Sequence, residues 1–355
     1  MRKNFIKREY KNFKGEILEI PGRTAAFFFL LTLCLLPILS QHPYLLLVLT
    51  YMNIYAIYAA SWDVLGGYTG QFSMGQGAFF GVAAYSAGLL NIHLGVPFWL
   101  TIPCGAIVGV ASGLIIALPA LKIRGVYFSL VSLAYPIILT GFVFAFSNIT
   151  GGEMGLSGIT AISNDRIVTY YISLVIMIIS VLTMWKFTDA NSKAFRIGIV
   201  LQAIREDEIS ARCSGINTIN YKLMAFGVSA FFAGIAGGLY VHVIRIIGPS
   251  TLELMWSFNP IIWTIFGGMG SIGGAVAGVF ILYPFMEVLR IIPEFRMLIF
   301  AGLIIGIILF MPEGIISWAR DKIERECPRC KIINYVTRQR CRACDANISS
   351  GRIFK

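Results

Sequence analysis

Long apolar segments follow one another along almost the whole chain, and they constrain its fold more than any other feature. A helix needs about 20 mostly apolar residues to cross roughly 30 Å of hydrocarbon. Segments of about this length span residues 24–40, 44–62, 71–92, 97–120, 125–146, 167–187, 223–247, 254–267, 273–290 and 297–312. They predict an all-α polytopic membrane protein with about 8–10 transmembrane or re-entrant helices.

The composition agrees with this fold class. Apolar residues make up 57% of the chain and charged residues only 13%, and the mean hydropathy is +0.76. Ordinary soluble domains carry about 25% charged residues. A soluble enzyme, a secreted disulfide scaffold and a disordered chain are therefore excluded.

Basic residues gather in a few hydrophilic segments. Most of the 29 Lys and Arg residues lie within residues 1–23, 122–124, 186–222 and 320–355. If residues 1–23 are cytoplasmic, alternating spans place all of these clusters inside, as the positive-inside rule requires. We therefore expect a multi-pass protein of the inner (cytoplasmic) cell membrane with both termini in the cytoplasm. The net charge of +11 would suggest nucleic acid on a soluble domain, but here we expect membrane lipid, and not nucleic acid, as the partner of these segments.

The first apolar segment, residues 24–40, shares a basic flank with signal peptides. Its basic region is long, however, and Ser40-Gln41-His42-Pro43 offers no small-x-small cleavage site. We expect a retained helix.

Two glycine-rich stretches interrupt the apolar pattern: GGYTGQFSMGQGAFFG at 66–81 and GGMGSIGGAVAG at 267–278. Glycine breaks in corresponding halves of a transporter point to its substrate path. The residues expected along that path are Gly67, Thr69, Gly70, Gln71, Ser73, Gly75, Gln76, Gly268, Gly270 and Ser271. The alternative interpretation is close helix packing through small residues.

The charge count also constrains residues 254–290. Because the basic tail must return to the cytoplasm, this pair of segments has to enter and leave from the same side. Both a re-entrant hairpin and two full spans satisfy that condition, so the sequence leaves them open.

The polar stretch 188–222 is too long for a simple connector and has a helical pattern. Ile199, Ala203, Ile204 and Ile209 recur at helical spacing, and Gly215 can end a helix in a left-handed turn. A short amphipathic helix-turn-helix suits a groove in a soluble partner. A helix lying on anionic lipid would carry more Lys and Arg on its polar face.

Several motifs, in order, resemble the permease subunits of branched-chain amino-acid ABC importers (LivM-like). They are GGYTGQFSMGQGAFFGVAAY at 66–85, LKIRGVYFSLVSLAYPII at 121–138, TGGEMGLSGI at 150–159, the loop and helix at 195–240, IFGGMGSIGGAVAG at 265–278 and FMPEGI at 310–315. The resemblance covers roughly residues 24–318. It divides the chain into a basic cytoplasmic segment at 1–23, a permease domain at 24–318 and a cytoplasmic tail at 319–355.

The resemblance implies partners. These are a second permease subunit, two ABC ATPase subunits and an external substrate-binding protein. It also implies that the 188–222 loop docks in an ATPase, a role that carries over to Arg205, Glu206, Asp207, Glu208 and Gly215. The centre of the loop, residues 210–214, departs from the Ala-rich pattern of the family.

No G-x-x-x-x-G-K-[ST] motif is present in the sequence. We therefore expect this chain to bind no nucleotide and to be a permease subunit, not an enzyme, with ATP hydrolysed by its partners. The expected activity is inward movement of branched-chain or other neutral amino acids. The alternatives are a urea or short-amide permease of the same family and a zinc-dependent membrane sensor. An integral-membrane enzyme would need a cluster of acids, His or Cys that the sequence lacks. Asp63 and Glu287 are rare acids near span ends, where a functional role and a simple end-of-span position both remain open.

Four cysteines in the tail form a C-x₂-C-x₁₀-C-x₂-C pattern: Cys327, Cys330, Cys341 and Cys344. Two paired thiolate motifs can close a tetrahedral Zn²⁺ site with no open position, so the metal would be structural. Disulfides are the rival interpretation, but a cytoplasmic tail is reducing. We expect a small zinc ribbon whose basic residues touch lipid, nucleic acid or a partner.

Overall fold

The computed structural model describes residues 21–40, 42–120, 125–189 and 197–311, and parts of the tail: residues 313–316, 318, 322, 324–327, 329, 333–335, 341 and 344. The predictions for residues 1–20, 122–124 and Cys330 lie outside these residues. Pro43–Gly314 forms one compact unit, and Met1–His42 with Ile315–Lys355 forms another.

The large unit is helical. Its long helices are α3 (Pro43–Thr69), α4 (Gln76–Leu94), α5 (Phe98–Ala120), α6 (Val126–Ala145), α8 (Arg166–Thr188), α11 (Thr218–Ile244), α12 (Leu254–Gly267), α13 (Ile272–Val288) and α14 (Pro293–Phe310). Short elements connect them: α7 (Ser147–Thr150), η1 (Gly152–Met154), α9 (Ile197–Glu206), α10 (Glu208–Cys213), η2 (Pro249–Leu252) and η3 (Leu289–Ile291). Among the described residues, seven helices are long and apolar enough to cross a membrane: α3, α4, α5, α6, α8, α11, and α13 together with η3. The predicted all-α polytopic class is confirmed.

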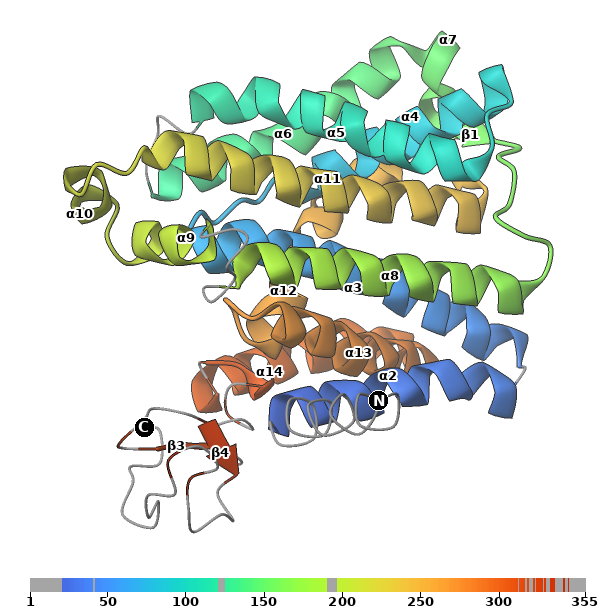
Figure 1. The fold of residues 1–355 in the computed structure, drawn as a ribbon. Coiled ribbons are helices and arrows are strands. Elements are labelled where there is room, and N and C mark those ends of the chain that lie inside the picture. The colour runs from blue at the N-terminus through green and yellow to red at the C-terminus, as the bar shows by residue number, and fades with distance from the viewer. Residues whose placement is uncertain are drawn as a thin grey trace, which may run out of the picture. The chain divides into compact units, whose positions relative to one another are not determined.

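The core is built around α3 and α11, which are the most buried of these seven helices. Helix α11 packs against α3, α4 and α5, and α3 also packs against α8, α12 and α13. Figure 1 shows α8 and α11 running side by side, with α9 and α10 at one end of both. The outer helices α6 and α8 leave large apolar side chains exposed, such as Val126, Tyr127 and Ile179. Such surfaces suit contact with lipid or with another membrane subunit.

The opposite end of α11 carries a small antiparallel sheet. Strand β1 (Leu156–Ser157) pairs with β2 (Ile246–Ile247), with Leu156 opposite Ile247. We call this the sheet end of the unit, and we call the end that carries α9 and α10 the α9 end.

The second unit contains α2 (Pro21–Leu39) and, in the tail, an antiparallel hairpin of β3 (Glu324–Glu326) and β4 (Ile333–Tyr335). Glu324 lies opposite Tyr335 in its register. The helical course of the predicted segment 24–40 is confirmed by α2.

The interruption expected in the glycine-rich stretch 66–81 is found in the structure, but it is short. Helix α3 continues through Gly67 to Thr69, and α4 begins at Gln76, so only residues 70–75 are non-helical. Similarly, the second break is confined to residues 268–271 between α12 and α13. Several helical glycines lie where neighbouring atoms leave no room for a side chain, such as the Gly270 backbone at Gly67 and the Leu252 side chain at Gly81.

Helices α12 and α13 are unequal arms of a hairpin. At 1.5 Å per residue, the 14 residues of α12 reach only about 21 Å. Helix α13 with η3 is long enough to cross a membrane. The arms pack backbone to backbone, because a Cβ on Gly278 would lie 2.0 Å from the carbonyl oxygen of Trp263.

Candidate functional site

The α9–α10 segment is amphipathic, but its inner stripe differs from the one that the sequence suggested. Gly198, Leu201 and Ile204 are buried against neighbouring helices, whereas Ile199 is 54% and Ile209 61% exposed. Helix α9 packs on α3, α8 and α11. An apolar, outward-facing surface therefore remains on α9 and α10.

Helix α10 begins at a side-chain cap. The Asp207 carboxylate accepts hydrogen bonds from the backbone N–H of Ile209 at 2.8 Å and of Ser210 at 3.2 Å, and from the Ser210 hydroxyl at 2.6 Å. The Ser210 hydroxyl is the largest of the causes that hold the pKa of Asp207 below its usual range, followed by these backbone bonds. The sequence placed one helix end at Gly215, and the structure adds a first break at Asp207.

Glu208 ties α10 to the first turn of α11. Its carboxylate lies 2.8 Å from Nζ of buried Lys222 and also pairs with Arg212. Partial burial raises the pKa of Glu208, but Lys222 and then Arg212 more than offset burial, and the pKa lies below its usual range. The Glu208 carboxylate is thus paired with cations of this chain, while neighbouring Glu206 is exposed.

Gly215 ends α10 as predicted. Its φ is +83°, in the left-handed region, and its N–H bonds to the Arg212 carbonyl at 2.9 Å. The next N–H, of Ile216, reaches the Ala211 carbonyl at 3.2 Å. These two bonds are the Schellman pattern that favours glycine at this position.

Arg205, on α9, reaches the end of α3. Its Nη1 donates to the Gly67 carbonyl oxygen at 2.6 Å, and its stem covers Gly70, whose φ is +70°. The last carbonyls of a helix lack intrahelical donors, and a cation there is favoured by the helix dipole. Arg205 therefore caps the C-terminus of α3 while its side chain stays partly exposed at the surface.

Asp63 lies one turn before Gly67 in α3 and is fully buried. Its Oδ1 accepts a hydrogen bond from the Gly270 N–H at 2.8 Å, in the turn between α12 and α13. A Cβ on Gly67 would lie 1.9 Å from this same Oδ1 and 2.6 Å from the Gly270 nitrogen. We call Asp63, Gly67, Arg205 and Gly270 the glycine junction, because it joins α3, α9 and the α12–α13 turn.

Further contacts hold the α12–α13 turn in place. Ser271 caps α13 by accepting from the Gly274 N–H at 3.2 Å. Gly314, from the FMPEGI motif, packs its backbone on the turn, since a Cβ there would lie 2.4 Å from the Gly268 Cα. The turn is therefore enclosed by backbone from several segments.

Three of the polar side chains expected along a substrate path, those of Thr69, Ser73 and Gln76, are buried and hydrogen-bonded to this chain. The Gln76 Nε2 donates to the Ser61 hydroxyl at 2.9 Å and the Ser229 hydroxyl at 3.1 Å. Thr69 bonds back to the Leu65 carbonyl within α3.

The 70–75 connection is held in the same way. The Ser73 carbonyl accepts from the Trp62 indole N–H at 2.7 Å. The Met74 N–H donates to the Ser132 hydroxyl at 2.9 Å, and Gly75 packs against the Ser132 carbonyl oxygen. Gln71 is buried, and its Oε1 has no hydrogen-bond partner among the described residues. Sequence reasoning missed the serines on neighbouring helices, which give no local signal.

A cleft of about 480 Å³ opens at the sheet end. Polar groups from Glu153, Tyr240, Ser250 and Thr251 help to line it. Glu153 is exposed there, from the loop that precedes β1. The other rare acid, Glu287, accepts from the Tyr44 hydroxyl and from Arg290 at 3.1 Å, so it is paired.

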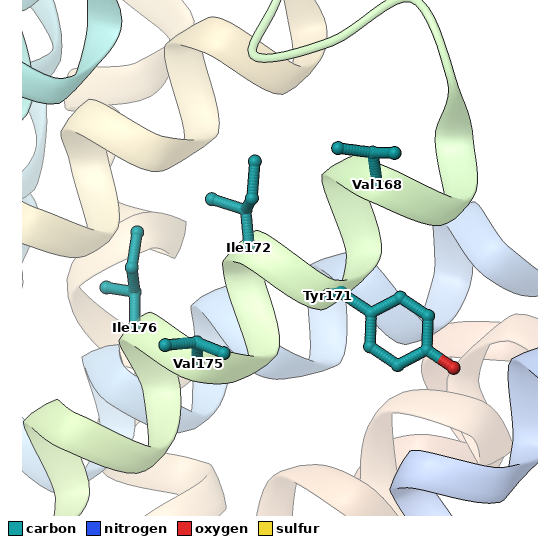
Figure 2. A pocket seen from close by; sticks show the side chains of 5 residues that line it. All are labelled: Val168, Tyr171, Ile172, Val175 and Ile176. Carbon is teal, nitrogen blue, oxygen red and sulfur yellow. The ribbon is translucent and has the colours of Figure 1, made fainter.

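A second hollow, on α8, carries no polar lining. Figure 2 shows its side chains, which all come from one helix: Val168, Tyr171, Ile172, Val175 and Ile176. Their spacing forms a single apolar stripe along the helix. Such a stripe suits lipid or a packed helix better than a polar substrate.

In the tail, Cys327, Cys341 and Cys344 place their sulfur atoms within 4.8 Å of one another. The Sγ atoms of Cys327 and Cys344 are 3.5 Å apart. Tetrahedral Zn²⁺ with Zn–S bonds of about 2.3 Å holds sulfurs roughly 3.8 Å apart, so this donor set fits the metal. The proximity that the motif predicted is thus found for three of its four cysteines, and Cys330 lies outside the described residues.

Comparison with known proteins agrees with the helical architecture. Residues 44–309 match the family profile described as branched-chain amino acid transport system / permease component. The high-affinity branched-chain amino acid transport system permease protein LivM of Salmonella typhimurium is 27% identical over 80% of this chain and 72% of its own length. LivM of Escherichia coli is 27% identical over 78% of this chain and 71% of its own length.

A third relative is also similar to this chain. The probable branched-chain amino acid transport permease protein LivM of Methanocaldococcus jannaschii is 25% identical over 61% of this chain and 67% of its own length. The family match ends before the tail cysteines. Together with the seven membrane-competent helices, it makes the chain a multi-pass membrane transporter subunit and not an enzyme. The chain belongs to the branched-chain amino acid transport system permease family.

Proposed function

We propose that this chain is a transmembrane permease subunit of an ABC importer that moves branched-chain or other neutral amino acids inward. The observation that carries the proposal is the contact of the α9–α10 loop with the end of α3, through Arg205 and Gly67. A permease that binds no nucleotide needs such a mechanical connection to an external motor. Family membership supports the substrate class.

The proposed partners are a second permease subunit, two ABC ATPase subunits and an external substrate-binding protein. The exposed Ile199 and Ile209 supply apolar contacts for a groove in the ATPase. Asp207 and Glu208 fix the fold of α10, and exposed Glu206 is available for a charged contact. We propose that the α9 end lies in the cytoplasm, with both chain termini on the same side.

We place the substrate path next to the two glycine segments, with Thr69, Gln71, Ser73 and Gln76 near one and Ser271 near the other. Their uncharged groups suit a zwitterion, because they bind it without holding a counter-charge. Thr69, Ser73, Gln76 and Ser271 hydrogen-bond to this chain in the present conformation. Their exposure to substrate would therefore accompany a movement of α3, α4 or the α12–α13 turn.

For the tail, we propose a structural Zn²⁺ held by Cys327, Cys330, Cys341 and Cys344. The close approach of three sulfurs and the β3–β4 hairpin next to Cys327 support this site. Thirty-odd residues bury too little apolar surface to fold alone, so the metal would supply the folding energy. We assign 1–23 to a basic cytoplasmic segment, 24–318 to the permease and 319–355 to the zinc ribbon.

The test is uptake by the complete importer in proteoliposomes. We expect ATP-driven, saturable uptake of radiolabelled leucine that unlabelled valine and isoleucine inhibit and urea does not. Uptake of urea or acetamide without uptake of amino acids would favour the alternative substrate class. ATPase subunits with an inactivated nucleotide site serve as the control for energy coupling.

A further inference from the structure

We propose that Asp63 and Arg205 act as a positioning pair that transmits movement of the α9–α10 loop to the α12–α13 turn. This inference rests on the proposed function, because it assumes that a partner moves the loop. It adds a residue, Asp63, whose place in the sequence gave it no role in coupling.

The first step is that Asp63 needs a partner. Its side chain is fully buried at the α9 end of α3, and a buried carboxylate is costly unless it is hydrogen-bonded and compensated by charge. Oδ1 accepts from the Gly270 N–H, and the Ser271 N–H acts on the same carboxyl group more weakly. Oδ2 has no partner within hydrogen-bond distance among the described residues.

The second step is that Arg205 supplies the compensating charge. It is the cationic group that acts on Asp63 among the described residues. Its Nη1 bonds to the Gly67 carbonyl and lies 2.7 Å from where a Cβ on Gly270 would be. The guanidinium thus lies next to both Gly67 and Gly270, and its charge acts on the carboxylate that binds the turn.

The third step is mechanical. Arg205 belongs to the loop, Asp63 to the central helix and Gly270 to the turn, so a shift of α9 changes the charge balance and the capping at once. If Arg205 moves away, the α3 carbonyl loses its donor and Asp63 loses its counter-charge. The hydrogen bond from the Gly270 N–H to Asp63 then weakens, and the α12–α13 turn is free to move. A movement of α9 thus causes a rearrangement of the α12–α13 turn, and this is how the two elements are coupled.

The experiment measures amino-acid uptake and ATP hydrolysis in the same proteoliposomes of the complete importer. The variants are Arg205→Gln, Arg205→Lys, Asp63→Asn and the double variant Arg205→Gln/Asp63→Asn. Arg166→Gln is the matched control, because Arg166 also donates through Nη1 to a backbone carbonyl of α3, that of Pro43 at 3.0 Å, but at the sheet end.

We expect Arg205→Gln and Asp63→Asn each to lower the number of molecules transported per ATP by about tenfold, within the roughly 5–150-fold range of typical coupling energies. ATP hydrolysis and assembly of the complex should persist. The double variant should lose no more than the larger single loss, because both residues serve one link. Arg205→Lys, which keeps the charge but not the planar fork, should recover part of the ratio, and Arg166→Gln should leave it unchanged.

An unchanged ratio in Arg205→Gln would overturn the inference, and so would losses that multiply in the double variant. If all four variants of Arg205 and Asp63 prevent assembly, the role of these residues is structural and the inference is wrong as well. Absence of amino-acid uptake by the unaltered complex would instead contradict the proposed function, so the two failures are distinguishable.

Discussion

Replacing Gly278 by alanine tests whether the arms of the α12–α13 hairpin touch as closely as the structure has them. The new Cβ would lie 2.0 Å from the Trp263 carbonyl oxygen and 3.1 Å from the Gly267 nitrogen, where ordinary contact begins near 3.4 Å. The arms must therefore part by more than an ångström. Overpacking of this kind costs about 1–3 kcal/mol, from which alanine's better helix propensity recovers no more than about 1 kcal/mol.

The matched control is Gly273→Ala, on the same helix, because nothing lies within 4 Å of a Cβ at that position. This variant should be neutral or more stable by up to about 1 kcal/mol. The two variants should therefore differ by roughly 1–3 kcal/mol. At roughly 2–4 °C per kcal/mol, thermal unfolding in detergent should separate their Tm values by about 2–12 °C. Equal Tm values, or a less stable Gly273→Ala, would refute the close packing of the two arms.

Three further predictions concern the surface and the tail. Single cysteines at Val200 and Tyr335, in a background without other thiols, should both be protected from an impermeant reagent in whole cells, and external labelling of either would contradict a shared cytoplasmic side. The purified chain should hold one Zn²⁺, Cys330→Ser should lower that content and make the tail sensitive to protease, and zinc that survives deletion of residues 320–355 would place the ligands elsewhere. The pKa of Glu208 is lowered in the fold, so its contribution is fully present above its unfolded value of about 4.3 and is lost as pH falls through the folded value. A spin label on Cys213 should accordingly stay immobile at pH 5 and become mobile in stronger acid. In Glu208→Gln the label should be mobile at both pH values. A mobility that does not change with pH in the unaltered chain would contradict the link between Glu208 and Lys222.

The helical segments were predictable because each depends on a local property. Each of the ten apolar stretches expected from hydropathy overlaps a helix, and the segment 254–267 coincides with α12. The left-handed turn at Gly215 was predictable for the same reason, since only the chain from Ala211 to Ile216 takes part in it. A sequence pattern is enough to predict an element when only neighbouring residues determine its structure.

The orientation of α9 was not predictable from its own residues. The sequence suggested a stripe that includes both Ile199 and Ile204, but residues five apart on a helix point about 140° away from each other. In the structure Ile204 is buried and Ile199 is exposed. The stripe that faces inward includes Gly198, where a side chain would collide with the Thr188 carbonyl oxygen. The neighbouring helix α8 therefore decides which face is buried.

The role of Asp63 was hidden for a related reason. An acid near a span end is as compatible with solvent as with burial, and the hydrogen-bond donor that decides between them comes from Gly270, more than two hundred residues further along the chain. The spacing of Asp63 and Gly67, one helical turn apart, is the local signal that could have pointed to a close approach. Both residues are buried, and both take part in the contact of α3 with the Gly270 backbone: Gly67 leaves room for it and Asp63 accepts its hydrogen bond.

The meaning of a glycine-rich segment in this fold thus depends on what lies opposite each glycine. Gly67 sits in a helix, where its lack of a side chain admits the backbone of Gly270. Gly270 itself has a φ of +77° and lies beneath Arg205, so it is constrained both by conformation and by space. In the present conformation these two residues form a closed contact beside the Arg205 side chain. For the coupling that we propose, the close packing of backbone at the glycine junction matters, because it would transmit a displacement of α9 instead of absorbing it.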